Sequence, residues 1–393
     1  MPFVASAFHR LLEPLDRRAI QRIVAEHRGD HGVGKGAKGW TCERHLKAVL
    51  FAQFAGLTSL REIEQALAAA PRSLYHLNLR AVPRSTLADA LALRPSEVFR
   101  DICTGLIGRV SRSVRREGQA LIELIDASPI PLRDRRFGWA EADARTRGLK
   151  LHMGYDPRAD LPSWVDVTSP KVSDIKAARQ RPVVKGTTYV FDKAYVDYGW
   201  WSLIHDQGAL FVSRLKTNAW RREVAVREPV GDSILADRDI QLGHARPRGG
   251  ATNPLADVAL REIIVEREGK KPLHLVTNDL ARPASEIAAL YKERWQIELL
   301  FKWIKQNLRI KRFLGRSENA VKSQIYIALI AFLLLRLFRH TYAKSHAAGA
   351  KVLIARLRIA LFGGFDLTNR SKPPPRHPRQ LPPSPQMALD LAL

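Results

Sequence analysis

The hydrophobic period of this chain changes at about residue 118, and this change constrains the fold more than any other feature. Before it, AFHRLLEPLDRRAIQRIV and HLKAVLFAQFAGL carry apolar residues at spacings of three and four, which predicts helices. After it, short strand-like runs alternate with a helix capped by Ser173 and a helix around 195–206. The strands are expected at 119–127, 149–156, 163–169, 187–192 and 209–215. These elements predict a mixed α/β sheet preceded by an all-α N-terminal domain over residues 1–118.

A β-rich block over residues 216–282 interrupts this order. Its runs REVAVREPV, DIQLG, ALREIIVERE and KPLHLVTND alternate like antiparallel strands, and a helix resumes at Pro283. We therefore expect a core in two parts, 119–215 and 283–345, with the β-rich block as an insertion between them. The succession of strands and helices in the first part is the order found in ribonuclease-H-like nucleases.

The C-terminal part of the chain contains one strongly apolar run and one proline-rich tail. The run at 325–338 is shorter than the roughly 20 apolar residues needed to span a bilayer, and it carries Arg336. We expect it to be a buried helix and expect no membrane partner. The segment 346–393 ends in a proline-rich stretch from Ser371 that we expect to be disordered.

Two short helices in the N-terminal domain have the spacing of a small bundle or of a DNA reader. One is expected to begin at Ser59 and the other at 83–85, with Ser59 and Ser85 as N-caps. A helix pair in a basic domain is consistent with a helix-turn-helix. Two helices of a bundle fit equally well, because the link at 70–82 is longer than the usual turn of three or four residues.

The charge of the chain favours a polyanionic partner. Its 64 Lys and Arg residues against 39 Asp and Glu residues leave a net charge of +25, spread along the whole length. Nucleic acid is the most common partner of such a protein, although charge alone also permits membrane surfaces and ribosomal RNA. The two cysteines, Cys42 and Cys103, make neither a disulfide framework nor a zinc cluster, so a reducing cytoplasm is expected.

Two aspartates follow apolar strands at places where apolar residues would normally continue. Asp126 follows Leu-Ile-Glu-Leu-Ile at the expected end of the first strand, and Asp192 closes the fourth, TTYVFD. If these strands are neighbours, the carboxylates lie close together and need a cation between them, for which Mg²⁺ or Mn²⁺ is suited. Three other acids fit less well: Glu123 has the opposite strand parity, Asp174 is expected to cap a helix, and Asp197 to lie on one.

The stretch YKERWQIELLFKWIK at 291–305 carries a polar stripe on a helix. Tyr291, Arg294, Glu298 and Lys305 fall within about 60° of arc on one face. Such a stripe is often only a solvated row of ion pairs. Glu298 is nevertheless the best candidate for a third carboxylate, with Arg294 and Lys305 placed to hold phosphates and Tyr291 to contact the strand.

The remaining apolar and cationic residues near these motifs give two further expectations. On the same helix, Leu299, Leu300 and Trp303 are patterned to be buried. At the end of the fifth strand, Arg214 and Lys216 share one face by the two-residue period, so they either hold phosphate or line a solvated edge.

The pattern Y-x2-R-x3-E-x6-K at 291–305, with Asp126 and Asp192, resembles the DDE transposases of bacterial insertion sequences, in the insertion sequence 4 family. IDASPI, GLKLHMGYD, FDKAYVDY and LYKERWQIELLFKWIKQNL resemble the family's catalytic core over roughly 119–340. VLFAQFAGLTSLREI and RSTLADALALRP resemble the N-terminal domain of one branch of the family.

This resemblance implies a ribonuclease-H-like fold with a β insertion, two Mg²⁺ ions that Mn²⁺ can replace, and cut-and-paste movement of an element. It implies that Asp126, Asp192 and Glu298 are the metal ligands. Tyr291, Arg294 and Lys305 would contact the element's end. The partners would be double-stranded DNA, as element ends and target, and a second copy in a DNA-bound synaptic complex at the nucleoid. Some relatives stack a flipped base on a tryptophan of the insertion; here only Trp220 is present, at the start of the insertion.

Three rival functions remain on the sequence alone. A transposase-derived regulator would bind the element's end without cutting it. A ribonuclease-H-like nuclease of DNA repair would cut without end-specific binding. A tyrosine recombinase would use Tyr291 as its nucleophile, but the cluster of Arg and His residues that it needs has no counterpart in the sequence.

Overall fold

The structure is a computed structural model that describes residues 6–34, 39–69, 74–114, 121–132, 134–140, 147–216, 218–244, 252–308 and 313–342. The segment 346–393, including the proline-rich tail from Ser371, lies outside the described residues. Most of the loop ARPRGGATNP of the insertion lies outside them as well.

All of the elements described before residue 115 are helices. They are α1 (Ala7–Leu12), α2 (Arg17–Glu26), α3 (Cys42–Ala55), α4 (Leu60–Ala69), α6 (Arg84–Leu93) and α7 (Ser96–Val114). The Oγ of Ser59 accepts a hydrogen bond from the N–H of Glu62 at 3.2 Å, so Ser59 caps α4 as predicted. The prediction for Ser85 is wrong, because α6 begins at Arg84 with Pro83 at the N-cap. The proline ring fixes φ at −61°, so the helix can begin directly after it.

One nine-stranded sheet contains both the predicted strands and the insertion. The strands are β1 (Leu121–Pro131), β2 (Gly148–Asp156), β3 (Leu161–Thr168), β4 (Thr187–Phe191), β5 (Leu210–Arg214), β6 (Arg221–Arg227), β7 (Ile234–Leu242), β8 (Leu260–Val265) and β9 (Leu273–Thr277). Their order is β3-β2-β1-β4-β5-β9-β8-β7-β6. β1 is parallel to β4, and β4 to β5, while the other neighbours are antiparallel. The insertion therefore continues the sheet of the core instead of forming a separate layer.

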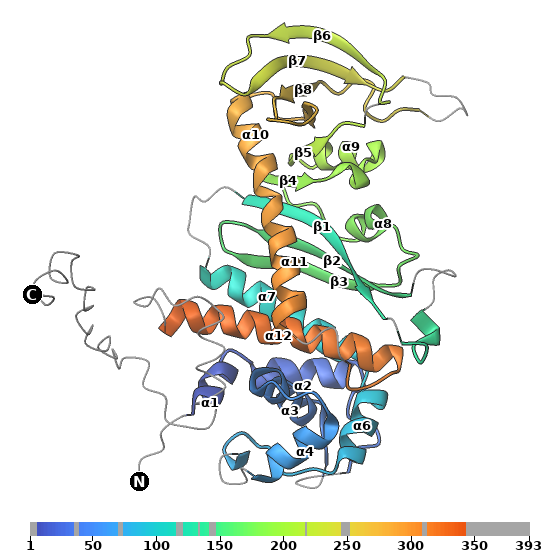
Figure 1. The fold of residues 1–393 in the computed structure, drawn as a ribbon, viewed down its shortest axis with the longest axis vertical. Helices are drawn as coiled ribbons and strands as arrows, with labels where there is room; N and C mark the ends of the chain where they lie inside the picture. Colours follow the sequence, from blue (N-terminus) through green and yellow to red (C-terminus); the bar gives the residue numbers. More distant parts are fainter. Residues whose placement is uncertain are drawn as a thin grey trace, which may run out of the picture.

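Helices cover both faces of this sheet (Figure 1). α10 (Ala284–Glu293) and α11 (Trp295–Asn307) lie on one face, and α8 (Asp174–Arg179) and α9 (Tyr198–Asp206) pack against the other. Alternation along the strands supplies a separate apolar cluster to each face: Leu124 and Val190 belong to the cluster under α10, whereas Ile125 and Phe191 join the tryptophans of α9. A short 3₁₀ turn, η3 (Lys193–Tyr195), links β4 to α9.

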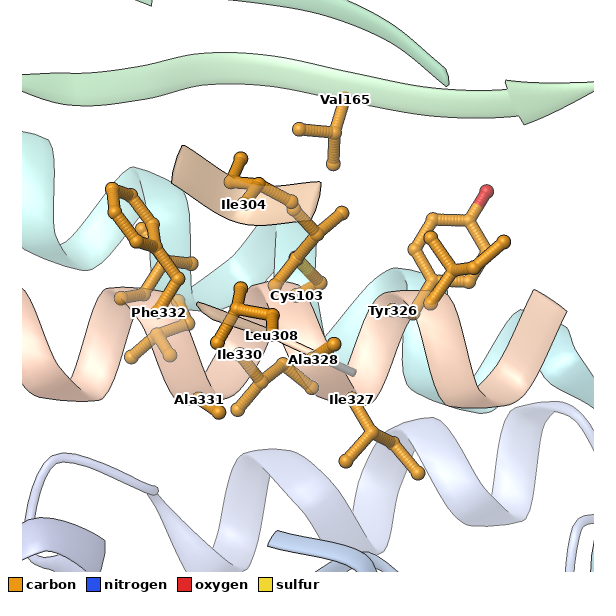
Figure 2. Packing of buried hydrophobic residues seen from close by; sticks show 14 of the residues in the cluster. Cys103, Val165, Ile304, Leu308, Tyr326, Ile327, Ala328, Ile330, Ala331 and Phe332 are labelled. Atoms are coloured by element: carbon orange, nitrogen blue, oxygen red, sulfur yellow. The ribbon is translucent and has the colours of Figure 1, made fainter. Parts of the chain in front are cut away.

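The apolar helix α12 (Glu318–Tyr342) connects the N-terminal helices to the sheet. It contacts α1, α3, α6 and α7 and also β3. In Figure 2, Ile327 points toward the N-terminal helices, whereas Tyr326 points toward the strand that carries Val165. By length and composition α12 could cross a membrane, but 83% of its most apolar window is buried inside the protein. The prediction of a buried helix is confirmed, and the two parts share one apolar core.

The burial of α12 predicts the cost of removing one of its side chains. Phe332 is fully buried, with its ring centroid 5.3 Å from that of Trp303. We expect Phe332→Ala to lower the free energy of unfolding by about 3–5 kcal/mol, measured by urea denaturation of the full chain. Leu93→Ala removes a side chain that is 72% exposed and should change it by no more than about 0.5 kcal/mol. Equal costs for the two variants would contradict a core centred on α12.

Candidate active site

Asp126 and Asp192 lie at the same level of the sheet. β1 and β4 are parallel, and their last aligned pair is Ile125 opposite Phe191. The next residue is Asp126 after Ile125 and Asp192 after Phe191, so the pairing of the strands brings the two carboxylates together. The expectation that Asp126 ends its strand is wrong: β1 continues to Pro131, because β2 still pairs with it beyond the point where β4 has ended.

The environment of Asp126 disfavours a negative charge in the protein without a cation. Its Oδ1 accepts a hydrogen bond from the N–H of Ala127 at 2.8 Å, and its side chain is 22% exposed. The pKa of Asp126 is raised to about 6, chiefly by burial and to a smaller extent by the charges of Glu298 and Asp192, against the opposing effects of the Ala127 N–H and Arg294. The three carboxylates are thus close enough to interact electrostatically.

Asp192 is held from three directions directly after β4. The backbone N–H of Lys193 donates to its Oδ1 at 2.7 Å, and the Tyr291 hydroxyl donates to the same oxygen at 3.3 Å. The Arg214 guanidinium lies 3.8 Å from it. Burial and the charge of Asp192 raise the pKa of Tyr291 to about 12, so its phenol remains protonated and can donate.

The predicted helix at 291–305 is divided at Arg294 into α10 and α11. The N–H of Arg294 bonds to the carbonyl of Tyr291, and the N–H of Ile297 bonds to the carbonyl of Arg294, both at 3.2 Å. These bonds span three residues instead of four, which tightens the chain by a local turn at Arg294. The polar side chains predicted to share one face nevertheless all reach the same end of the sheet.

The apolar residues of α11 divide differently from the prediction. Leu300 is buried and Trp303 is partly buried against the core, but Leu299 is 51% exposed. Trp295 is exposed as well, at 57%. The buried stripe of the helix consists of Ile297, Leu300, Phe301 and Ile304, and this spacing turns Leu299 outward.

Arg294 joins the helix to the strand aspartates. Its Nη2 donates to Glu298 Oε1 at 2.7 Å, and its Nη1 lies 3.6 Å from Asp126 Oδ2. The guanidinium also lies over the ring of Tyr291, at 5.7 Å from the centroid. One cation therefore bridges two of the three candidate carboxylates.

Lys305 reaches β1 through a residue that the sequence did not single out. Its Nζ donates to Ser128 Oγ at 2.6 Å, and Ser128 is buried. Ser128 follows Asp126 by two residues and so projects from the same face of β1, which is the only signal that could have identified it. Lys216, by contrast, lies beyond the end of β5 and is exposed.

The competing acids are occupied elsewhere. Glu123 pairs with Arg181 on the opposite side of β1, as its parity indicates. Asp174 accepts from Lys150 Nζ at 2.9 Å at the beginning of α8. Asp197 caps α9 by accepting from the N–H of Trp200 at 2.8 Å.

The donors at this site suit a hard divalent cation, although they do not enclose one as they stand. All three are carboxylates, which are the preferred ligands of Mg²⁺ and Mn²⁺. Within the described part of the chain, no three acidic, histidine or cysteine side chains converge closely enough to bind a metal ion. Enclosure would require Glu298 to release Arg294.

Two family models match this chain. A family model described as the transposase DDE domain matches residues 117–334, which is more than half of the chain. A second model, a domain of unknown function designated DUF4372, matches residues 4–80.

Three relatives point to the same family. A protein of Sinorhizobium fredii assigned as transposase y4zB is 40% identical over 303 residues, which cover 74% of this chain and 81% of the relative. The protein assigned to insertion sequence element IS4SA of Synechocystis sp. is 50% identical over 68% of this chain and 75% of its own length. The protein assigned to insertion sequence element IS5377 of Geobacillus stearothermophilus is 27% identical over 66% of this chain and 68% of its own length. The chain therefore belongs to the DDE transposases and is a DNA transposase of an insertion sequence.

Proposed function

We propose that this transposase moves its element by cut-and-paste transposition, with Asp126, Asp192 and Glu298 as the catalytic carboxylates. The observation that carries the proposal is the alignment of Ile125 with Phe191, which sets the two aspartates side by side under Glu298. The enzyme would bind the terminal inverted repeats, cleave the DNA at the element boundary and join the freed 3′-hydroxyl to target DNA.

The strand order supports a ribonuclease-H-like core. Three antiparallel strands, β3, β2 and β1, followed by the parallel β4 and β5, match the order expected for that fold. We assign residues 119–215 and 283–345 to this core and residues 216–282 to its β insertion. Residues 1–118 would form the N-terminal DNA-binding domain. Within it, α4 and α6 contact each other and are the pair available for a helix-turn-helix.

DDE transposases use divalent metal ions, and the three carboxylates would hold them here. We propose two Mg²⁺ ions, which Mn²⁺ can replace. When bound, such ions activate a water molecule for attack on the phosphodiester and stabilise the leaving oxygen.

The other side chains would position the carboxylates and the DNA. The Tyr291 hydroxyl holds Asp192, and Arg294 holds Glu298 until the ligands close. Lys305 and Arg214 flank the site with positive charge that suits a phosphodiester backbone. Lys216 would extend this contact along the DNA.

The net charge of +25 suits double-stranded DNA as both element end and target. Because two ends must be paired, two copies are expected in the DNA-bound complex, acting on the nucleoid in the cytoplasm. A hairpin step is left out of the proposal, since Trp220 lies at the edge of the insertion with its ring 4.2 Å from that of His244.

Removal of one carboxylate should separate cleavage from binding. We expect Glu298→Gln to lower Mg²⁺-dependent nicking of a labelled duplex bearing the element's end by roughly a thousandfold or more, because a ligand of the metal ions is lost. Binding of the same duplex in Ca²⁺, measured by gel shift, should change little. Glu286→Gln on the exposed side of α10 is the matched control and should cut normally. If the wild type binds the end but cuts in no metal, a binding-only regulator becomes the better description.

The raised pKa of Asp126 predicts a stability cost at neutral pH. The folded state binds this proton more tightly than the unfolded state, so the cost of ionisation is complete above pH 6 and declines as the pH falls toward 4. At pH 8 in EDTA, we expect the free energy of unfolding of Asp126→Asn to exceed that of the wild type by on the order of 2 kcal/mol, measured by urea denaturation. At pH 4.5 the difference should fall to roughly a third.

Two comparisons make this stability experiment decisive. Asp232→Asn, at an exposed carboxylate, should match the wild type within about 0.5 kcal/mol. Mg²⁺ should stabilise the wild type but not Asp126→Asn. A wild type that is as stable as Asp126→Asn in EDTA at pH 8 would contradict the crowding of carboxylates at this site.

Loss of a phosphate contact should change the salt dependence of DNA binding. We expect Lys305→Ala to reduce the slope of log affinity against log salt concentration by about one, measured by fluorescence anisotropy with an element-end duplex. Lys185→Ala removes an exposed lysine before the opposite end of β4 and is the control. If Lys305→Ala leaves the slope unchanged, Lys305 serves only to hold Ser128.

A further inference from the structure

The outermost strand of the insertion, β6, is an open edge of the nine-stranded sheet. β6 pairs with β7 on one side, and among the described residues no strand pairs with its other side. None of its seven residues is buried. In Figure 1 it lies at the top of the molecule, at the far end from the N-terminal helices. The other terminal strand, β3, is covered by α7 and α12, so the two ends of the sheet are treated differently.

From its second residue, β6 and the residue after it read Arg222-Glu223-Val224-Ala225-Val226-Arg227-Glu228. When this heptapeptide is read in the reverse direction, each positively charged position becomes a negatively charged one, and each negatively charged position becomes a positively charged one. A second copy laid antiparallel about Ala225 therefore places Arg222 opposite Glu228 and Glu223 opposite Arg227 of the other copy. Opposite charges directly across two antiparallel strands stabilise the pair.

Only this register gives such a match among its neighbours. A shift by one residue in one direction places Arg222 opposite Arg227, and a shift in the other places Glu223 opposite Glu228. Either shift brings like charges together, which destabilises strand pairing. The charges of the edge thus favour one alignment of two copies over its neighbours.

The apolar residues of the edge agree with the same register. Val224 is 60% exposed and Val226 is 74% exposed. In the symmetric alignment, Val224 of one copy lies opposite Val226 of the other. Exposed valines on an open edge strand favour aggregation unless the edge is protected. Here the flanking charges disfavour strands of another sequence.

We propose that β6 is a self-association edge, through which two copies of this chain pair as antiparallel strands about a twofold axis at Ala225. The pairing would extend one sheet through both copies and leave both candidate active sites uncovered, because β6 is four strands removed from β5. The interface uses none of the catalytic carboxylates. Its test needs neither DNA nor metal, so its outcome is independent of the proposed chemistry.

Cysteine cross-linking locates the twofold axis. The native cysteines, Cys42 and Cys103, are fully buried, so Ala225→Cys supplies the single exposed thiol among the described residues. Residues opposite each other in antiparallel strands have Cα atoms about 4.5–5.5 Å apart, within the range that a disulfide bridges. We expect mild oxidation of the full-length variant to give a disulfide-linked dimer on a non-reducing gel.

Val230→Cys is the matched control, because Val230 is also exposed but lies five residues from the axis. In the proposed register its two copies would be about 33 Å apart. Cross-linking through residue 225 should be at least roughly tenfold faster than through residue 230. Equal rates would overturn the proposal.

Charge reversal tests the register itself. Glu223 forms an ion pair with Arg238 within the sheet, and Arg227 forms one with Asp239. The Arg222 side chain donates a hydrogen bond to the neutral side chain of Gln241, and Glu228 is exposed beyond the strand, so Arg222 and Glu228 are the better targets. We expect Arg222→Glu and Glu228→Arg each to weaken dimerisation about tenfold, measured by sedimentation equilibrium. The double variant should restore it, because the opposite charges then face each other again.

Each outcome of the sedimentation series decides the proposal. Dimerisation by the wild type, loss in both single variants and recovery in the double variant support pairing through β6. A monomeric wild type at micromolar concentration, a dimer indifferent to both single variants, or a double variant as weak as the single ones overturns it. Circular dichroism of every variant shows that the sheet remains folded.

Discussion

The parallel pairing of β1 with β4 is the interaction on which the rest of the site depends. The two strands are parallel, and Ile125 is aligned with Phe191, so the residues that follow these two must be neighbours. Both residues are aspartates, and the arrangement would be unfavourable without a cation. The helices on the two faces, and the insertion on one side, all serve to hold this edge in place. A slip of one residue would turn one aspartate into the opposite apolar core.

Positive charges and one hydroxyl donor partly compensate the negative charge of the carboxylates. Arg294 lies between Asp126 and Glu298, Arg214 lies near Asp192, and the Tyr291 hydroxyl donates a hydrogen bond to Asp192. In the proposed mechanism, metal ions and phosphates would take the places of these groups around the carboxylates. Binding of substrate would then exchange one set of opposite charges for another. The local turn at Arg294 gives its side chain a position that a regular helix would not.

The sequence predicted the elements well because their hydrophobic periods are strong, and it singled out Asp126 and Asp192 because each follows an apolar strand run. It failed where the outcome depended on a partner that lies far away in the chain. Asp126 does not end β1, since β2 pairs beyond it. Leu299 faces outward because the sheet selects a different stripe of α11. Ser128 was not singled out, because its hydrogen bond is with Lys305, which lies 177 residues away in the sequence.

The position of α12 in the chain also determines when the protein can complete its core during synthesis. The N-terminal helices end at Val114, but the helix that they pack against begins only at Glu318. At about 5–20 residues per second, a ribosome needs roughly 10–40 s to cover that interval. During this time the nascent helices expose apolar surface that only α12 will bury. A chain interrupted between Glu298 and Glu318 would contain all three carboxylates and still lack the element that unites its two parts, so premature termination there should yield a substrate for proteases and not a partial enzyme.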